Sequence, residues 1–235
     1  MARTVVVGDV HGCRRELEEL LSKVGRTRDD RLCFVGDLLA RGPDGLAVLE
    51  LVEGLGADVV LGNHERRLLE VRQARVRGER PRRLGPSHAR LFESMGEEHF
   101  RMLEAFPYWL DLPEHELRIV HAGVVPGVPI EEQDPWALTH MRTLTPDGRA
   151  SDTRDGVLWG ERYTERPHVV FGHNAVDGLQ IHAHATGIDT GCVYGNTLTA
   201  LVLPKGCRVP EPDDRRDALV GVQAHRAWVE LRPGA

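Results

Sequence analysis

The chain has 235 residues, of which 41% are hydrophobic and 28% are charged, and this composition excludes an intrinsically disordered protein. Its formal net charge of −6 disfavours a general nucleic-acid coat protein, because binding to a phosphate backbone needs a basic surface. The four cysteines form no Cys-x-x-Cys pair, which argues against a structural zinc finger and a disulfide scaffold.

Three short apolar runs in the first 65 residues share one pattern. They span 4–7, 32–35 and 58–61, and each is followed by a glycine and then a polar residue. Short apolar runs bounded by glycine are typical of buried strands. Apolar residues at helical spacing over 17–24 and 44–55 lie between the runs. We therefore predict a βαβαβ unit with a parallel sheet.

Residues 66–90 differ in composition from the rest of the chain, because they hold nine arginines and two glutamates. This composition predicts a solvated helix and loop or, as an alternative, an arginine-bearing cap near a polyanionic substrate. The following segment, 91–111, predicts one further helix or two short ones. Together they form an inserted helical cap at about 66–111.

Strand-like runs return at 117–120, 168–171 and 197–203. We expect the main domain to span 1–204, with the cap inserted in it. The polar segment 205–235 is expected to be a loosely held C-terminal tail.

Polar side chains follow the predicted strands. Parallel strands present their carboxyl ends at one edge of a sheet, where ligands bind, so these side chains should converge. After the first three strands they are Asp9, His11, Asp37, Asn63 and His64, and after two later strands they are His121 and His173. Taken alone, each is more typical of a turn, a cap or a hydrogen-bonded structural group. The repetition of the pattern at five strand ends favours a shared site.

Six of these residues are candidate metal ligands: Asp9, His11, Asp37, Asn63, His121 and His173. Oxygen and imidazole ligands without thiolate suit manganese, iron, cobalt or zinc rather than calcium. Six ligands exceed what one ion needs when water must also bind, so we expect two ions with Asp37, on the middle strand, between them. Two ions about 3.5–4 Å apart would lower the pKa of a water between them and hold both oxygens of an in-line displacement at phosphorus.

The motifs around these residues resemble the signature motifs of the phosphoprotein phosphatase family of metallophosphoesterases. They are Gly8-Asp9-Val10-His11-Gly12, Gly36-Asp37-Leu38-Leu39-Ala40-Arg41-Gly42-Pro43, Gly62-Asn63-His64-Glu65 and His121-Ala122-Gly123. The resemblance implies a calcineurin-like α/β fold with a central pair of mixed β-sheets flanked by helices. It also implies the six metal ligands, Arg41 as a catalytic residue that binds substrate phosphate, and His64 as the general acid.

Position 40 separates branches of this family. Protein phosphatases carry an aspartate there, which steadies the histidine of the Gly-Asn-His motif, whereas symmetrical bis(5′-nucleosyl)-tetraphosphatases carry alanine, as this chain does at Ala40. Later motifs also resemble that branch: Leu138-Thr139-x-Met141-Arg142, Pro146-x-Gly148-Arg149 and Asp189-Thr190-Gly191-Cys192. They imply Arg142 as a second catalytic, phosphate-binding residue.

The resemblance implies hydrolysis of dinucleoside polyphosphates, chiefly of diadenosine tetraphosphate into two ADP. Ala40 suits this substrate, because a nucleoside diphosphate leaves as an anion near neutral pH, whereas a serine alkoxide needs a well-oriented acid. A Ser/Thr or Tyr protein phosphatase of the same family is the alternative enzyme. A metal-dependent binding module without catalysis is the alternative of a different class.

The expected cofactors are two divalent metal ions, with manganese first and cobalt, iron or zinc as alternatives. The expected partner is a small dinucleoside polyphosphate, with phosphoproteins or capped RNA ends as alternatives. Apolar runs in the sequence fall short of the ~18 residues that a membrane span needs, and three N-terminal valines are too few for a signal-peptide core. We therefore expect a cytoplasmic protein without membrane contact, and a monomer.

Overall fold

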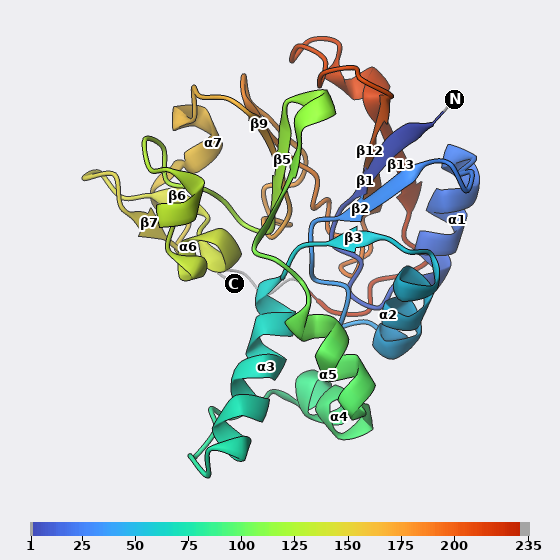
Figure 1. Cartoon of the computed structure of the whole chain (residues 1–235), viewed down its shortest axis with the longest axis vertical. Coiled ribbons are helices and arrows are strands. Elements are labelled where there is room, and N and C mark those ends of the chain that lie inside the picture. Colours follow the sequence, from blue (N-terminus) through green and yellow to red (C-terminus); the bar gives the residue numbers. More distant parts are fainter. Residues whose placement is uncertain (1, 231–235) are drawn as a thin grey trace.

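The computed structural model describes residues 2–230 and contains two five-stranded sheets and one three-stranded sheet. The two large sheets lie next to each other in the middle of the molecule, with helices on their outer sides and a group of three helices below them (Figure 1). This architecture agrees with the expected pair of mixed sheets flanked by helices.

The first sheet has the order β13-β12-β1-β2-β3. Its strands are β1 (Arg3–Val7), β2 (Arg31–Phe34), β3 (Asp58–Val59), β12 (Thr197–Pro204) and β13 (Leu219–Gln223). The strands β1, β2 and β3 are parallel, and the two helices between them are α1 (Arg14–Val24) and α2 (Gly45–Gly54). The predicted βαβαβ unit is therefore confirmed, and antiparallel pairing of β12 with β1 makes the sheet mixed.

The apolar spacing in α1 has the expected effect on packing. Leu17, Leu20 and Val24 are buried, and they join the cluster that contains Val5 and Phe34 of the first sheet. The helix ends at Gly25, which has a φ of 63°. Glycine adopts this left-handed conformation without the steric cost that a Cβ brings.

The second sheet has the order β10-β11-β9-β5-β4. Its strands are β4 (Trp109–Leu112), β5 (Leu117–Val120), β9 (His168–Phe171), β10 (Gln180–Ile181) and β11 (Ala185–Gly187). The strands β5, β9 and β11 are parallel. Between the two large sheets, Val6 and Cys33 pack in one cluster with Ile119 and Val170. This shared core fixes the two sheets relative to each other.

Smaller elements complete the fold. The three-stranded sheet consists of β6 (Thr143–Leu144), β7 (Ala150–Ser151) and β8 (Val157–Leu158), and the short helices are η1 (Pro113–His115), η2 (Ile130–Glu132), α6 (Pro135–His140), α7 (Trp159–Arg162) and η3 (Arg215–Ala218). Leu138 of α6 and Trp159 of α7 pack against Phe171 on the outer face of the second sheet. This packing holds α6 beside the carboxyl end of β9.

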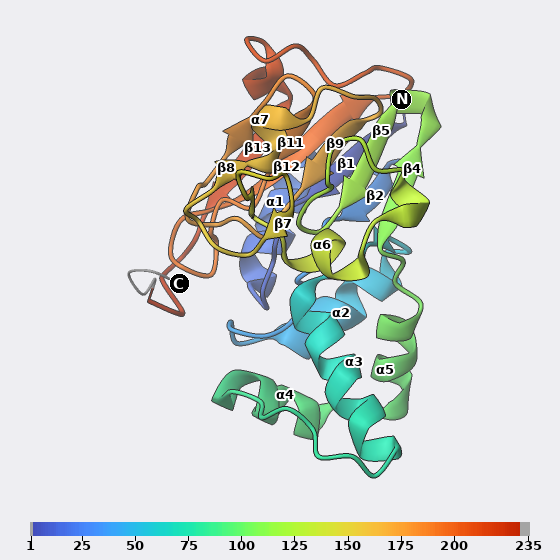
Figure 2. The ribbon, with the colours of Figure 1, turned by 90° about the vertical axis from the view of Figure 1, so that its left-hand side faces the viewer.

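The helical cap consists of α3 (Asn63–Val76), α4 (Pro86–Ser94) and α5 (Glu97–Glu104). It extends from one end of the two sheets, and α4 and α5 lie on opposite sides of α3 (Figure 2). The guanidinium of Arg72 binds the carboxylates of Glu97 and Glu104, which ties α3 to α5. The segment 91–111 thus contains parts of two helices, one of the two patterns that the sequence predicts.

The described part of the C-terminal segment, residues 205–230, is packed against the body rather than loosely held, in contrast to the expectation. Its strand β13 pairs along five residues of β12, and Arg215 is only 1% exposed. The Arg215 guanidinium donates hydrogen bonds to the carbonyls of Pro210, His182 and Ala185. The polar residues of this segment do not predict such packing. It arises because β13 covers an edge of the first sheet whose backbone groups would otherwise be unpaired. Within residues 2–230, none of the helices has the length and apolar character that crossing a membrane requires.

Candidate metal centre

Strands from both large sheets end at the same place, and their ends carry the predicted polar residues. The six candidate ligands follow β1, β2, β3, β5 and β9, and they are Asp9, His11, Asp37, Asn63, His121 and His173. Asp9, His11, Asp37 and His121 are each at most 3% exposed. The structure therefore brings together residues that lie as far as 164 positions apart in the sequence, as the hydrogen bond between His173 and Asp9 shows.

Asp37 belongs to two groups of side chains that could hold a metal ion. One group is His11, Asp37 and His64, and the other is Asp37, His121 and His173, with the ligand atoms of each group within 4.8 Å of one another. The carboxylate Oδ2 of Asp37 lies 3.5 Å from Nε2 of His11 and 3.5 Å from Nε2 of His121. The carboxylate that the sequence places on the middle strand therefore stands between two sets of imidazoles.

Backbone carbonyls orient the imidazole rings. His11 donates from Nδ1 to the carbonyl of Leu39 at 3.1 Å, and His121 donates from Nδ1 to the carbonyl of Val35 at 2.8 Å. His173 uses its other nitrogen, since Nε2 donates to the carbonyl of His140 at 3.0 Å. In each ring the remaining nitrogen then carries a lone pair directed at the centre. Such outer hydrogen bonds fix the tautomer of metal-binding histidines.

Acceptor atoms meet at Asn63. Its side-chain Oδ1 lies 3.0 Å from Nε2 of His121 and 3.1 Å from Nδ1 of His173. Burial lowers the pKa of His121 to about 4, so this ring is neutral at pH 7 and its Nε2 carries no proton. Three lone pairs that face one another at such distances repel, and a cation among them removes the repulsion. The donor set therefore fits a divalent metal ion.

Two further buried carboxylates, Asp189 and Glu65, belong to this region, and neither has a role assigned from the sequence pattern. Burial, followed by the charges of Asp189 and Asp37, raises the pKa of Asp9 well above its ordinary value. Asp189 follows β11, next to β9, so the rule that located the other residues also applies to it. Concentrated acidic groups in a buried site favour bound cations, because burial of an uncompensated charge is costly.

Glu65 is the second of these carboxylates, and it holds the loop that carries Asp37. Its side chain accepts hydrogen bonds from the backbone N–H groups of Asp37 at 2.9 Å and Leu39 at 3.0 Å. Asp37 in turn accepts from the N–H of His64 at 3.1 Å. The first turn of α3 therefore fixes the position of the Asp37 carboxylate.

The loops of the centre have unusual backbone conformations. Six described residues other than glycine have a positive φ, and five of them lie here: His11, Asp37, Ala40, Arg41 and His173. Such conformations are rare for these residue types and gather at functional sites. Gly62 has a different reason to lack a side chain, because a Cβ there would overlap Oδ1 of Asp37.

Two arginines approach the centre from outside the ligand set. The guanidinium of Arg41 hydrogen-bonds the hydroxyl of Tyr194, and its Nη1 lies 3.5 Å from Nε2 of His11. Arg142 has a buried Nη1 without a hydrogen-bond partner among the described residues. Burial and the charges of Arg154 and Arg41 lower the pKa of Arg142. An anion between the two guanidinium groups would satisfy both of them.

His64 lies at the edge of the centre, with its Nε2 3.9 Å from Oδ2 of Asp37. Its Nδ1 is buried and has no partner in residues 2–230. The ring of His88, from α4, stacks on the ring of His64 with centroids 4.8 Å apart and an interplanar angle of 21°. The N-terminus of α4 is held there by Ser87, whose hydroxyl accepts a hydrogen bond from the backbone N–H of Arg41 at 2.8 Å.

Comparisons with known proteins agree with this geometry. The symmetrical bis(5′-nucleosyl)-tetraphosphatase of Nitrosomonas europaea is 30% identical, over 85% of this chain and 94% of that protein. The asymmetrical bis(5′-nucleosyl)-tetraphosphatase PrpE of Geobacillus thermodenitrificans is 32% identical, over 88% and 93%. A crystal structure of a protein that carries the provisional name diadenosine tetraphosphatase has a TM-score of 0.81 and 34% identity, over 94% of this chain and 93% of that one.

The fold is also shared with more distant enzymes. A serine/threonine phosphatase from Saccharomyces cerevisiae has a TM-score of 0.57 at 16% identity, over 98% of this chain and 81% of that one. The family model for the calcineurin-like phosphoesterases matches residues 2–202. The chain therefore belongs to the calcineurin-like phosphoesterase family, whose members are metal-dependent hydrolases.

Proposed function

We propose that this protein hydrolyses dinucleoside polyphosphates at a two-metal centre and splits diadenosine tetraphosphate into two ADP. The position of the Asp37 carboxylate, 3.5 Å from a histidine of each ligand group, carries the proposal. The tetraphosphatase names of relatives that are 30% and 32% identical support the substrate class.

The six candidate ligands would hold two divalent cations, and Asp37 belongs to both groups of side chains that could hold one. We expect manganese, with cobalt, iron or zinc as alternatives, because the set contains oxygen and imidazole donors without thiolate. When bound, two such ions supply a water of lowered pKa as the nucleophile and positive charge for the phosphoryl oxygens.

Arg41 and Arg142 bind the oxygens of the reacting phosphate. A guanidinium group can donate two parallel hydrogen bonds to phosphate oxygens. The unpartnered Nη1 of Arg142 supports this role, because a buried donor without a partner is costly until a ligand accepts from it. Negative charge grows on the phosphoryl oxygens in the transition state, and fixed cations placed beforehand stabilise it there.

His64 donates a proton to the leaving oxygen. Burial and the charges of His11 and Arg41 lower its pKa well below the ordinary value, which disfavours the protonated ring and makes His64 a weak proton donor near neutral pH. Ala40 supplies no carboxylate to its Nδ1, so the ring is positioned by packing against His88 instead. A nucleoside diphosphate leaves as an anion near neutral pH and needs little protonation. This leaving group therefore tolerates a weakly held acid better than a serine alkoxide does.

The choice of the phosphoanhydride bond that is cleaved needs its own argument, because the names of the relatives include both symmetrical and asymmetrical enzymes. Symmetrical cleavage yields two ADP, and asymmetrical cleavage yields ATP and AMP. The motifs from Leu138 to Cys192 support the symmetrical reaction. Monomeric state, cytoplasmic location, and a main domain that ends at residue 204 stay predictions from the sequence.

Product analysis tests the proposal. The protein is freed of metal with a chelator and reloaded with manganese. It is then incubated with diadenosine tetraphosphate in ¹⁸O-labelled water, and the nucleotides are separated and analysed by mass spectrometry. We expect two ADP per substrate, with the label on a terminal phosphate, and no turnover before manganese is added. ATP with AMP would refute symmetrical cleavage. A higher kcat/KM on phosphopeptides than on the dinucleotide would favour the protein phosphatase, and turnover of neither would favour a binding module.

A further inference from the structure

A cavity of about 420 Å³ opens beside the metal centre, where the cap meets α6. Asn63 and His64 line it on the side of the centre, and Arg67, Arg82 and Trp136 line it further out. Its volume lies within the range of small-molecule sites in proteins, roughly 300–1,000 Å³. A ligand group attached to a phosphate at the centre can extend into this cavity, because Asn63 and His64 belong to both.

The arginines of the cap fall into two classes that composition alone cannot separate. Arg66 is paired with Glu70, Arg72 with Glu97, and Arg77 with Glu79. Salt bridges of this kind neutralise the charge within the protein.

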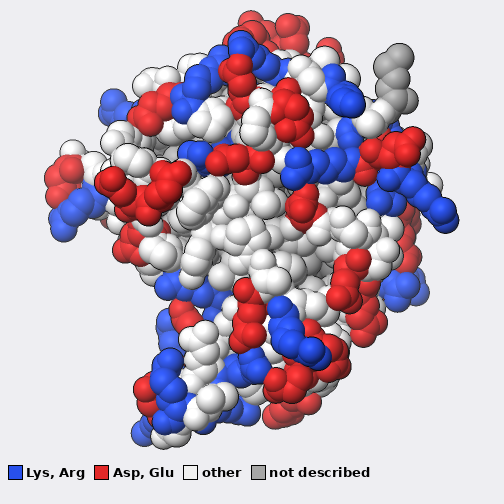
Figure 3. Space-filling model, viewed as in Figure 1, with Lys and Arg blue, Asp and Glu red and all other residues white. Residues whose placement is uncertain are grey.

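Arg67 and Arg82 differ from these arginines, because neither has a carboxylate within 4.0 Å in the described part of the chain. The pKa of Arg67 is lowered by burial and, second, by the positive charge of Arg82. The space-filling view shows basic side chains on the cap along the notch that separates it from the body (Figure 3). Arg67 donates a hydrogen bond to the carbonyl of Arg83, but neither guanidinium group has a carboxylate partner. Two such groups in the lining of one cavity favour an anion, and planar guanidinium groups suit phosphate.

The acidic groups of the cavity do not compensate this charge. Glu70 is already paired with Arg66, at 3.0 Å. Asp152 is the remaining carboxylate of the lining. The two positive charges of Arg67 and Arg82 thus outnumber the one negative charge of Asp152.

The opposite wall offers a flat aromatic surface. The rings of Trp136 and His140 on α6 are stacked, with centroids 5.8 Å apart and an interplanar angle of 6°. The carbonyl of His140 accepts the hydrogen bond from Nε2 of His173, so this surface has a fixed position relative to the centre. Aromatic side chains of this kind stack on any nucleobase, because every base has a π-face.

We propose that this cavity binds the nucleoside phosphate on one side of the reacting phosphorus. In this arrangement the base stacks on Trp136, and the phosphate next to the ribose binds Arg67 and Arg82. The proposal rests on the proposed function for its substrate class and adds the residues that select a nucleotide. A bare phosphate ester would occupy the centre and leave the cavity unused, whereas a nucleotide fills both its aromatic and its basic part.

Calorimetric titration of the full chain with ADP tests the proposal. Trp136→Ala is expected to weaken ADP binding about tenfold, in line with about 1–3 kcal/mol for one stacked base, and Trp136→Phe restores binding to within about threefold. The double variant Arg67→Gln/Arg82→Gln is expected to weaken ADP about tenfold or more. Arg77→Gln removes one charge from the same helix region outside the cavity and should bind ADP like the parent.

Titration with pyrophosphate separates the two walls. The arginine double variant should weaken pyrophosphate binding, and Trp136→Ala should change it by less than twofold, because pyrophosphate has no base to stack. Thermal unfolding of each variant within about 2 °C of the parent shows that the fold is intact; a variant outside this range is replaced by Trp136→Leu or by the single arginine variants.

The outcomes distinguish this inference from the proposed function. If ADP binding depends on Trp136 and the two arginines but diadenosine tetraphosphate is not cleaved, the cavity assignment stands and the proposed function fails. If the dinucleotide is cleaved while all cavity variants bind ADP like Arg77→Gln, the cavity assignment is wrong. Loss of phosphopeptide binding in the variants, with ADP binding unchanged, would show that a peptide occupies the cavity and would also overturn it.

Discussion

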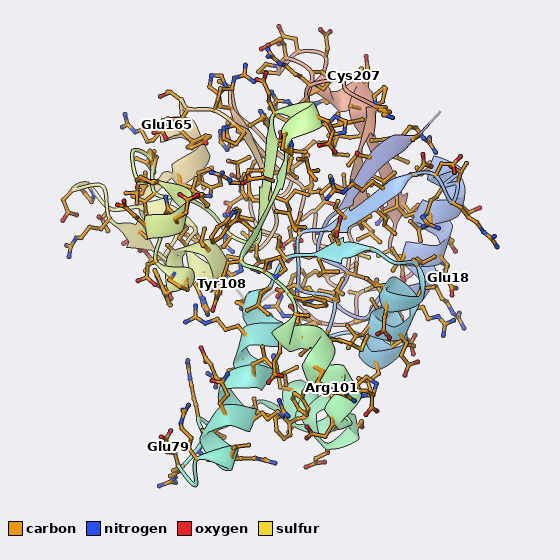
Figure 4. The ribbon with its side chains drawn as sticks, in the orientation of Figure 1. Glu18, Glu79, Arg101, Tyr108, Glu165 and Cys207 are labelled. Carbon is orange, nitrogen blue, oxygen red and sulfur yellow. The ribbon has the colours of Figure 1, made fainter. Side chains whose placement is uncertain are left out.

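The strand-end centre and the helical cap are constructed in different ways. In the centre, buried side chains are held by backbone groups, as with His11 on the Leu39 carbonyl. In the cap, α4 has no buried residue, whereas α3 and α5 are joined by buried apolar residues such as Leu68 and Phe100 and by the ion pairs of the partly buried Arg72. Figure 4 shows the labelled residues Glu79 and Arg101 on the cap, where both side chains are exposed. The fold therefore fixes the chemistry of the centre, whereas the exposed side chains of α4 can change at little cost in stability.

Substitution of Asp37 should have the largest effect. Asp37→Asn keeps the shape of the side chain but removes the charge that both groups of histidines share. We expect kcat to fall about 10²- to 10³-fold or more, the scale at which loss of one charge-stabilising group acts. Bound manganese should fall from two ions per chain to one or fewer, measured by mass spectrometry of the dialysed protein. Circular dichroism checks the fold, and full activity in a folded variant would contradict the role of Asp37.

Substitution of His64 should depend on the leaving group. General acids contribute about 10²–10⁴-fold where the leaving group is basic. His64→Ala should therefore slow a phosphoserine peptide by at least about 10²-fold and diadenosine tetraphosphate by less than about tenfold. The comparison uses kcat for both substrates with the same protein preparation. Equal losses on the two substrates would show that His64 does not act as the acid.

Substitution of His88 tests how the cap acts on the centre. A stacked ring pair contributes about 0.5–1.5 kcal/mol of interaction free energy. His88→Ala removes this contribution, so it should lower kcat on the phosphoserine peptide about threefold to tenfold. His88→Phe, which keeps a ring in the stack, should recover most of this loss. In the His64→Ala background, His88→Ala should have no further effect, because a positioning residue acts only through the group it positions. Additive effects in this cycle would refute the positioning role.

Loss of the ion pairs of Arg72 should have the smallest effect. Arg72 holds α3 to α5 from a side chain that is 21% exposed. Pairs near the surface contribute about 0.2–1 kcal/mol, so Arg72→Gln should lower the Tm by about 1–4 °C. The kcat on the dinucleotide should stay within twofold of the parent. A large loss of kcat without a change in Tm would mean that the cap and the centre are coupled more tightly than their packing indicates.

The sequence alone predicts that the side chains at the strand ends converge, as they do in the structure, but it does not predict the packing of the cap, for a physical reason. The strands β1 and β2 are continuous apolar runs, and the polar residues that follow them are placed by local chain geometry, so Asp9 and Asp37 are visible in the sequence. Asp189 follows the same rule, but its strand β11 is only three residues long, and its motif receives no role. The pairing of β13 with β12 is invisible because β13 begins in a polar segment and pairs with residues about twenty positions away.

The pairs Arg66–Glu70 and Arg77–Glu79 follow from local spacing, but the contrast between Arg67 and Arg72 could not be predicted from local sequence. Arg67 and Arg72 lie five residues apart on one helix, in segments of similar composition. The difference between them arises because Arg72 finds Glu97 and Glu104 on α5, whereas Arg67 turns toward the cavity. Only the packing of α3 against α5 decides which charge is neutralised.

Anomalous X-ray diffraction at the manganese edge, on crystals of the manganese-loaded protein, tests the central claim most directly. We predict two manganese peaks on either side of the Asp37 carboxylate, one on the side of His11 and the other on the side of His121. A single peak, or two peaks of which neither touches Asp37, would contradict a shared two-metal centre at the joined strand ends.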